Sequence, residues 1–118
     1  MRKFVVILAL VLVAAVGVHA GTALIYQNQN TDIDAAVEVL DSSAPDDCLI
    51  VTVQAAPANT GNIYVGSTTV ATTTGYVLTV TQPTLTLNGD YRNRIDASAL
   101  YVTATAANQT AGIVCIYE

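Results

Sequence analysis

Short stretches of alternating apolar and polar residues, separated by turn residues, fill the chain after residue 20 and constrain its fold more than any other feature. A side-chain period of two is typical of strands that bury one face, and no apolar spacing of three to four residues indicates an amphipathic helix there. We expect strands at Leu24–Gln27, Ile33–Leu40, Cys48–Ala56, Ile63–Gly66, Tyr76–Val80, Thr84–Leu87, Leu100–Thr105 and Ala111–Glu118. Only Ile33–Leu40 could alternatively form a short helix. The pattern predicts an all-β fold, a single antiparallel β-sandwich or jelly roll of about seven or eight short strands.

The core of this domain is predicted from the same alternation. Each fully buried aliphatic side chain contributes ~1.5 to 3 kcal/mol by area. The residues expected to supply most of the core are Leu49, Val51, Val53, Ile63, Val65, Leu78, Val80, Leu85, Leu87, Leu100, Val102, Val114 and Ile116.

The first twenty residues form a separate unit. Arg2 and Lys3 precede an unbroken apolar run, Phe4–Val18, and small residues stand at Val18 and Ala20, as a signal peptidase requires. A helix of that run would reach about 22 Å, short of the ~30 Å hydrocarbon core. The length favours a signal peptide over residues 1–20, ahead of a β-sandwich domain over residues 21–118. The alternative is a retained hydrophobic helix, with membrane contact only through residues 4–25.

Charge and reactive side chains narrow the function. Without the leader, Arg92 and Arg94 are the only basic residues against nine acids, so the surface repels phosphate backbones and nucleic-acid binding is not expected. The single histidine, His19, lies in the leader, which leaves no Ser-His-Asp arrangement. The chain has no Trp, so a carboxylate pair such as Asp46 and Asp47 lacks the stacking cleft of a glycosidase. We expect no enzyme, no metal site and no cofactor.

The two cysteines, Cys48 and Cys115, both lie in strand-like runs. An exported protein could join them in a disulfide, whereas a particle assembled in the cytosol would keep them reduced. Cysteine is also often buried without a partner, so the sequence leaves both states open.

The stretch Asn59–Gly66 (NTGNIYVG) is predicted to be a turn that leads into a short strand. Pro57 ends the preceding strand because it has no N–H for the ladder. Asn59 and Gly61 tolerate a positive φ, and Gly66 closes the following strand. We expect Gly61 to adopt a conformation that alanine would resist.

Residues 48–118 resemble a group of small accessory virion proteins of tailed bacteriophages. The resemblance lies in Asn59-Thr60-Gly61, in Ile63–Gly66, in the later Gly75–Thr79 (GYVLT) and in the closing Ile95–Glu118. It implies a β-sandwich without catalysis, placed on the virion surface as a capsid decoration or attachment protein, with capsid or tail proteins and further copies of itself as partners. Such proteins normally lack a signal peptide, and their proline-glycine turn is replaced here by TVTQPT. The alternatives are an exported bacterial surface or adhesion module, secreted or in the cell envelope, and a membrane-anchored pilus-like or envelope subunit.

Tyrosines are enriched at protein interfaces. The tyrosines of this chain are too numerous to be buried together in one small core with every hydroxyl group hydrogen-bonded. Tyr64, Tyr76, Tyr91 and Tyr101 are therefore candidate interface residues of a homo-oligomer, for which a trimer is the leading hypothesis. Arg92 and Arg94 could dock an acidic neighbour, although a local ion pair with Asp90 or Asp96 is the favoured interpretation.

Overall fold

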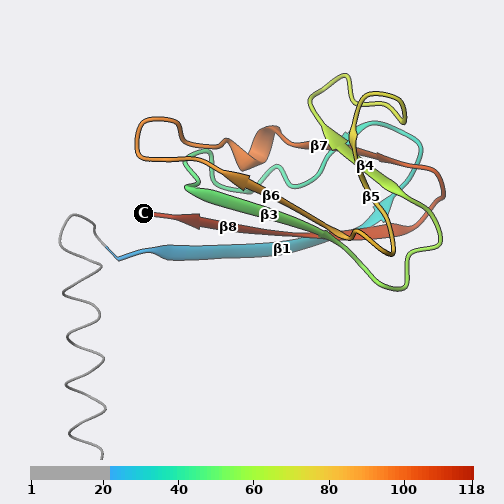
Figure 1. Ribbon diagram of the computed structural model, residues 1–118, viewed down its shortest axis with the longest axis horizontal. Coiled ribbons are helices and arrows are strands. Elements are labelled where there is room, and N and C mark those ends of the chain that lie inside the picture. Colours follow the sequence, from blue (N-terminus) through green and yellow to red (C-terminus); the bar gives the residue numbers. More distant parts are fainter. Residues whose placement is uncertain (1–21) are drawn as a thin grey trace, which may run out of the picture.

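The computed structural model describes residues 22–118, which form eight strands in two four-stranded antiparallel sheets (Figure 1). The elements are β1 (Leu24–Ile33), β2 (Glu38–Val39), β3 (Ile50–Ala55), β4 (Ile63–Gly66), β5 (Tyr76–Leu78), β6 (Thr84–Asn88), the 3-10 helix η1 (Ala97–Ala99), β7 (Tyr101–Ala104) and β8 (Gln109–Tyr117). The all-β, antiparallel prediction is confirmed. The expected N-terminal helix lies outside the described residues. Among residues 22–118, no helix has the length and apolar character needed to cross a membrane.

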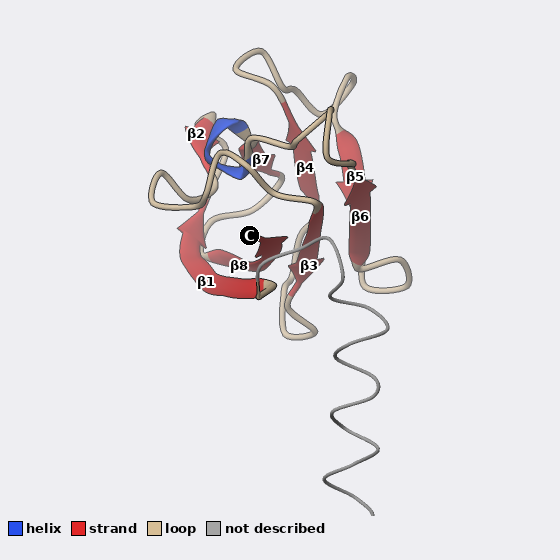
Figure 2. Cartoon of the chain, turned by 90° about the vertical axis from the view of Figure 1, so that its left-hand side faces the viewer, coloured by secondary structure: helices blue, strands red, loops and turns tan. Residues whose placement is uncertain are grey.

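One sheet has the strand order β1-β8-β3-β6 and the other the order β2-β7-β4-β5. The chain changes sheet at most of its connections, so strands distant in sequence become neighbours. The first strand lies against the last, from Leu24 opposite Tyr117 to Asn30 opposite Ala111. Figure 2 shows β7 and β4 on one side of the domain and β8 and β3 on the other.

A single core lies between the two sheets and is built by alternate residues of their strands. β3 directs Val51, Val53 and Ala55 inward, and β4 directs Ile63 and Val65 inward. Further buried residues are Ile33, Leu40, Ala44, Cys48, Leu78, Ala97, Val102, Ala104, Ala111, Ile113 and Cys115. Leu85, Leu87 and Leu100 pack against this core while partly exposed. Leu49 and Ile116 are also only half-buried.

Four residues predicted for the core do not belong to it, namely Leu49, Ile116, Val80 and Val114, and Ile116 lies on the same outer face of β8 as Val114. Val114 is 37% exposed because β8 turns Ile113 and Cys115 inward instead. The segment Gly112–Tyr117 is apolar on both faces, so its sequence does not reveal which alternate set is buried. Val80 is 67% exposed because β5 ends at Leu78, before a turn in which Gln82 accepts a backbone hydrogen bond from Thr79.

The prediction for Ile33–Leu40 is wrong over most of its length. Ile33 ends β1, which is longer than expected, and only Glu38–Val39 forms a strand in the remainder. The carboxylate of Asp34 accepts the backbone N–H of Ala36 at 2.8 Å, a local turn that competes with sheet pairing. Alternation alone therefore gave a misleading signal here.

Cys48 and Cys115 form a disulfide, with their Cα atoms 5.7 Å apart and both side chains fully buried. Cys48 precedes β3 and exchanges two backbone hydrogen bonds with Ile95, whereas Cys115 lies in β8. The bond therefore ties the start of β3 and the segment before η1 to the last strand.

Candidate binding surface

The outer face of the β1-β8-β3-β6 sheet is a regular array of uncharged side chains. Its strand register produces three cross-strand rows, and we call these residues the open face. The rows are Ile25–Ile116–Ile50–Asn88, Gln27–Val114–Thr52–Thr86 and Gln29–Gly112–Gln54–Thr84. The most exposed apolar member is Ile25, at 69%.

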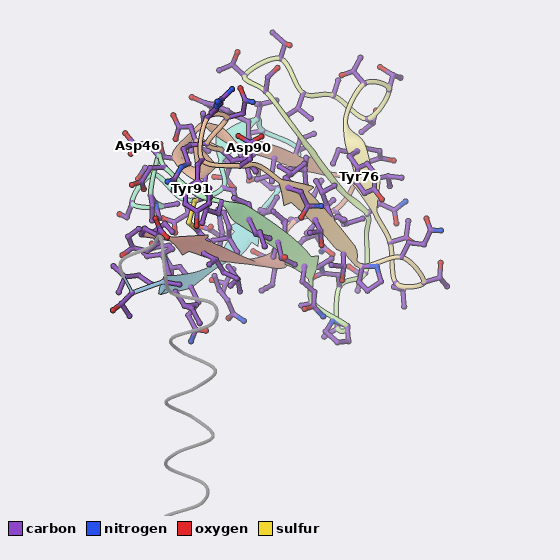
Figure 3. All side chains as sticks on the ribbon, turned by 60° about the vertical axis from the view of Figure 1, so that its left-hand side comes forward. Asp46, Tyr76, Asp90 and Tyr91 are labelled. Atoms are coloured by element: carbon purple, nitrogen blue, oxygen red, sulfur yellow. A yellow bond between two sulfur atoms is a disulfide. The ribbon has the colours of Figure 1, made fainter. Side chains whose placement is uncertain are left out.

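The open face is uncharged although the chain is acidic. The segments Leu49–Gly89 and Ala97–Tyr117 contain no Asp, Glu, Lys or Arg. Outside the first residues of the chain, charged side chains occur only between Asp32 and Asp47, between Asp90 and Asp96, and at Glu118. Asp46 and Asp90 lie toward the same end of the domain in Figure 3. Most charged side chains therefore lie at connections, apart from Asp32 near the end of β1 and Glu38 in β2, and the open face carries none.

A shallow hollow of about 470 Å³ lies in the middle of the open face, bounded by Gln27, Asn28, Gln29, Thr52, Gln54, Gly112, Ile113 and Val114. Gly112 lies between Gln29 and Gln54 in its row and has no side chain. The surface is therefore lower at Gly112 than at its neighbours, and this forms the bottom of the hollow. A Cβ placed on Gly112 would come no closer than 3.6 Å to another atom, so the fold does not require a glycine here. A smaller hollow of about 250 Å³ continues past Gln54 toward Pro57.

The outer face of the second sheet is covered by the chain itself. The loop between β4 and β5 folds back, and its Val70 is buried against Gly66 and Gly75. At the other side of this face, the hydroxyl of Thr103 donates to the carbonyl of Ala35 at 3.0 Å, and the N–H of Ala104 donates to Asp34. Both hollows lie on the opposite sheet, so the open face is the broad sheet surface that the chain leaves uncovered.

A polar cluster joins the inner side of β1 to the loop that follows β2. The carboxylate of buried Asp41 accepts from the hydroxyl of Tyr26 at 2.6 Å, from the amide of Asn28 at 3.2 Å and from the backbone N–H of Ser43 at 3.0 Å. Burial raises the pKa of Asp41, but these three hydrogen bonds outweigh it and hold the pKa below its usual value. The same bond to Asp41, with burial, raises the pKa of Tyr26.

A second acid lies beside this cluster. Burial and the nearby charge of Asp32 raise the pKa of Glu38, whose carboxylate accepts from the amide of Asn30 at 3.4 Å. Every buried side-chain nitrogen and oxygen among the described residues has a hydrogen-bond partner. The cluster is thus internally satisfied and fastens β1 in place.

The stretch Asn59–Gly66 is held by one residue that the sequence did not single out, Gln109. Its side-chain oxygen accepts the backbone N–H groups of Thr60 and Gly61, both at 2.9 Å, and its amide donates to Thr60 and to the carbonyl of Ala107. Asn59 also exchanges two hydrogen bonds of 2.8 Å with the backbone of Thr110. The stretch is therefore fixed to the start of β8 and serves the fold.

The expectation of a positive φ at Gly61 is wrong. No glycine among the described residues has a positive φ, and the non-glycine residue that does is Asn108, at 58°. Gly61 is needed because a Cβ there would lie 2.7 Å from Thr105 Oγ1 and 2.9 Å from Ala106 Cβ. Gly66 is similarly constrained, since its Cβ would lie 3.0 Å from Val70 Cγ2. Close approach, rather than backbone conformation, explains both glycines.

The candidate interface tyrosines do not share one surface. Tyr64 and Tyr101 are half-buried on β4 and β7, whereas Tyr76 and Tyr91 are exposed at opposite ends of the domain (Figure 3). None of the four belongs to the open face.

The two arginines also differ from the expected local pairs. The guanidinium of Arg94 lies 5.1 Å from the ring centre of Tyr91, donates to the carbonyl of Asp47 and reaches Glu118 at 3.9 Å. Arg92 is exposed, and its backbone N–H donates to the carboxylate of Asp90. Asp96 caps η1 by accepting from Ser98. The nearest acid to Arg94 is thus the C-terminal residue rather than Asp90 or Asp96.

No group of three or more His, Cys, Asp and Glu side chains within residues 22–118 is placed to hold a metal ion. Comparison with protein-family models, with curated proteins and with solved structures gives no match. Function is therefore inferred from the surface itself.

Proposed function

We propose that the chain is a non-enzymatic structural module, a β-sandwich that binds another protein through its open face. The observation that carries the proposal is the absence of charge from the open face of an acidic chain. The centre of a protein interface is depleted of charged residues, because each one must lose its water when the surface is covered. A sheet of Gln, Thr and aliphatic side chains avoids that cost and still offers hydrogen bonds.

The contrast between the two sheets supports the same proposal. The chain covers the outer side of the second sheet with its own loops, whereas it leaves the open face bare. A partner on the open face would cover the exposed Ile25 and Val114 and fill the hollow above Gly112.

Two locations are compatible with this module, and different observations favour them. The disulfide between Cys48 and Cys115 favours an oxidising compartment, and with the predicted signal peptide it supports an exported module, secreted or in the cell envelope. The resemblance of residues 48–118 to phage accessory proteins supports a capsid decoration or attachment protein on the virion surface. In a virion assembled in the cytosol, the two cysteines should be reduced when the particle forms.

A photo-crosslinking residue at Thr52, in the middle row of the open face, tests the proposal in the full chain. The matched control is the same residue at Thr72, an exposed position in the loop that covers the second sheet. We expect protein adducts from Thr52 and few from Thr72. Capsid or tail peptides in the adducts would support the virion, and envelope peptides the exported module. Equal labelling at both positions, or no protein adduct at Thr52, would contradict docking at the open face.

A further inference from the structure

The free edge of β1 is the longest unpaired strand edge among the described residues. β1 has ten residues, whereas the other edge strands β2, β5 and β6 have two, three and five. Side chains on both sides of β1 are largely exposed, apart from Tyr26, Asn30 and the buried Ile33.

The backbone groups at this edge can be assigned from the neighbouring pairs. The carbonyls of Thr110 and Ile116 accept from β3 or its flanking residues, at 2.9 and 2.7 Å, so even-numbered residues of β8 bond toward β3. In an antiparallel sheet the residues of a strand bond alternately to its two neighbours, so odd-numbered residues of β8 bond toward β1. Their partners in β1 are Tyr26, Asn28 and Asn30. Ile25, Gln27 and Gln29 consequently direct their N–H and C=O groups away from the sheet.

Strand edges are commonly protected by lysine, proline, an inward-pointing charge, a β-bulge or a short strand. The register shift of β1 lies between Asn30 and Ile33, so the edge before Asn30 carries none of these devices. Residues Leu24–Thr31 contain no charge and no proline, and residues 22–118 contain no lysine. The edge is therefore chemically available for pairing.

We propose that β1 pairs antiparallel with β1 of a second copy of this chain, about a two-fold axis at Gln27. Gln27 then lies opposite Gln27 of the other copy, and Ile25 opposite Gln29. Ile25, Gln27 and Gln29 of each copy direct their backbone groups outward, so these residues pair across the axis. Together they form about six new backbone hydrogen bonds. The β1-β8-β3-β6 sheets of the two copies then form one eight-stranded sheet, and their two open faces form one continuous uncharged surface.

The charge distribution is compatible with a second copy in this register. Two acidic chains repel each other, and the acids nearest the pairing residues are Asp41, bound to Tyr26 and Asn28, and Glu38, bound to Asn30. Both lie on the inner side of β1, and the residues that pair with the copy are themselves uncharged. Asp32 falls opposite Thr22 of the other copy and lies about 33 Å from the other Asp32 at ~3.3 Å per residue. That separation exceeds the ~8 Å Debye length of physiological salt, so the repulsion is screened. The side chains of Gln27 are self-complementary, since each amide both donates and accepts.

The test uses the full chain in the form that an exporting host delivers. Its mass in solution is measured first. Sedimentation then follows association up to roughly 1 mM, the concentration at which even a weak contact of ~4 kcal/mol is half-formed. We expect a concentration-dependent dimer. Gln27→Pro removes one outward N–H and spares the bonds to β8, so it should weaken the dimer at least about tenfold. Gln27→Ala retains that N–H and should stay within about threefold of the parent. Thermal unfolding of each variant checks that the domain is folded.

Two further variants separate this proposal from docking at the open face. Gln27→Lys places like charges together on the two-fold axis, so its dimer should weaken at low salt and partly recover at high salt. Thr52→Lys lies two strands from the edge, so it should block docking while leaving the dimer intact. A monomer or a trimer of the parent, a dimer unaffected by Gln27→Pro, or a dimer lost in Thr52→Lys would overturn the pairing through β1.

Discussion

The side-chain oxygen of Gln109 accepts the backbone N–H of Gly61 at 2.9 Å, across a sequence separation of 48 residues. The same oxygen binds the N–H of Thr60, and Gln109 itself is only 2% exposed. The buried side chain of Gln109 therefore supplies the hydrogen-bond acceptor that the backbone N–H groups of the turn before β4 do not find within the turn.

Gln109→Leu should destabilise the domain by ~2 to 4 kcal/mol. The substitution preserves much of the side-chain volume but leaves the N–H groups of Thr60 and Gly61 without an acceptor. Each N–H that water does not reach lowers the free energy of unfolding by ~1 to 3 kcal/mol. Urea unfolding followed by circular dichroism measures the difference. Gln29→Leu, at an exposed glutamine of the open face, is the matched control and should change the free energy of unfolding by less than ~0.5 kcal/mol. Similar losses in both variants would contradict the role of Gln109.

Gly61→Ala and Gly112→Ala should have opposite effects on stability. The new Cβ at Gly61 would overlap Thr105 and Ala106, which should cost ~1 to 3 kcal/mol. At Gly112 the Cβ meets only ordinary contacts, and alanine restricts the unfolded chain, so ~0.4 to 1 kcal/mol of added stability is expected. Melting temperatures of the two variants suffice as a measurement. An unchanged or raised melting temperature for Gly61→Ala would show that the contact with Thr105 is not as close as described.

The strands that the sequence predicted well are those where apolar and polar residues alternate without ambiguity. β3 alternates Val51 and Val53 with Thr52 and Gln54, and the buried set is the predicted one. β8 carries apolar residues on both faces, since Val114 and Ile116 have the same character as Ile113 and Cys115. Only its neighbours β1 and β3 determine which set is buried, and that information is not local.

The candidate surface was harder to predict than the fold. The open face combines residues from four strands, and its row Gln27–Val114–Thr52–Thr86 exists only once the strand order and register are known. Gln109 was missed for a related reason, because its partners lie in a distant turn. The absence of charge from Leu49 to Gly89 was a readable signal, but it does not show which face of a strand stays uncovered.

Removing the disulfide by Cys48→Ala with Cys115→Ala should lower the free energy of unfolding by ~2 to 5 kcal/mol. The bond closes a loop over a sequence separation of 67 residues, and such a link restricts the unfolded chain. Chemical denaturation with and without reductant measures the loss. Reductant should destabilise the parent and leave the double variant unchanged. A parent that is insensitive to reductant under denaturing conditions would argue that the bond is not formed in the protein as produced.

Tyr26→Phe should destabilise the domain in a pH-dependent way, because it removes the hydroxyl that donates to the carboxylate of Asp41 at 2.6 Å. A hydrogen bond to a charged group contributes ~1.5 to 3 kcal/mol, so that loss is expected at neutral pH. The pKa of Asp41 is lowered in the folded state, so its stabilisation is present above the usual Asp pKa and is lost as the pH falls through the folded value. The difference between the parent and Tyr26→Phe should therefore shrink in acid.

The alkaline side of the profile depends on Tyr26 itself. The pKa of Tyr26 is raised, so its stabilisation is present below the usual Tyr pKa and is lost as the pH rises through the folded value. The difference between the parent and Tyr26→Phe should therefore shrink at high pH as well. Asp41→Asn is the control, since it removes the titrating carboxylate and should flatten the acid side of the profile. A difference between parent and Tyr26→Phe that stays constant from neutral pH to below the pKa of Asp41 would contradict a charged hydrogen bond at this position.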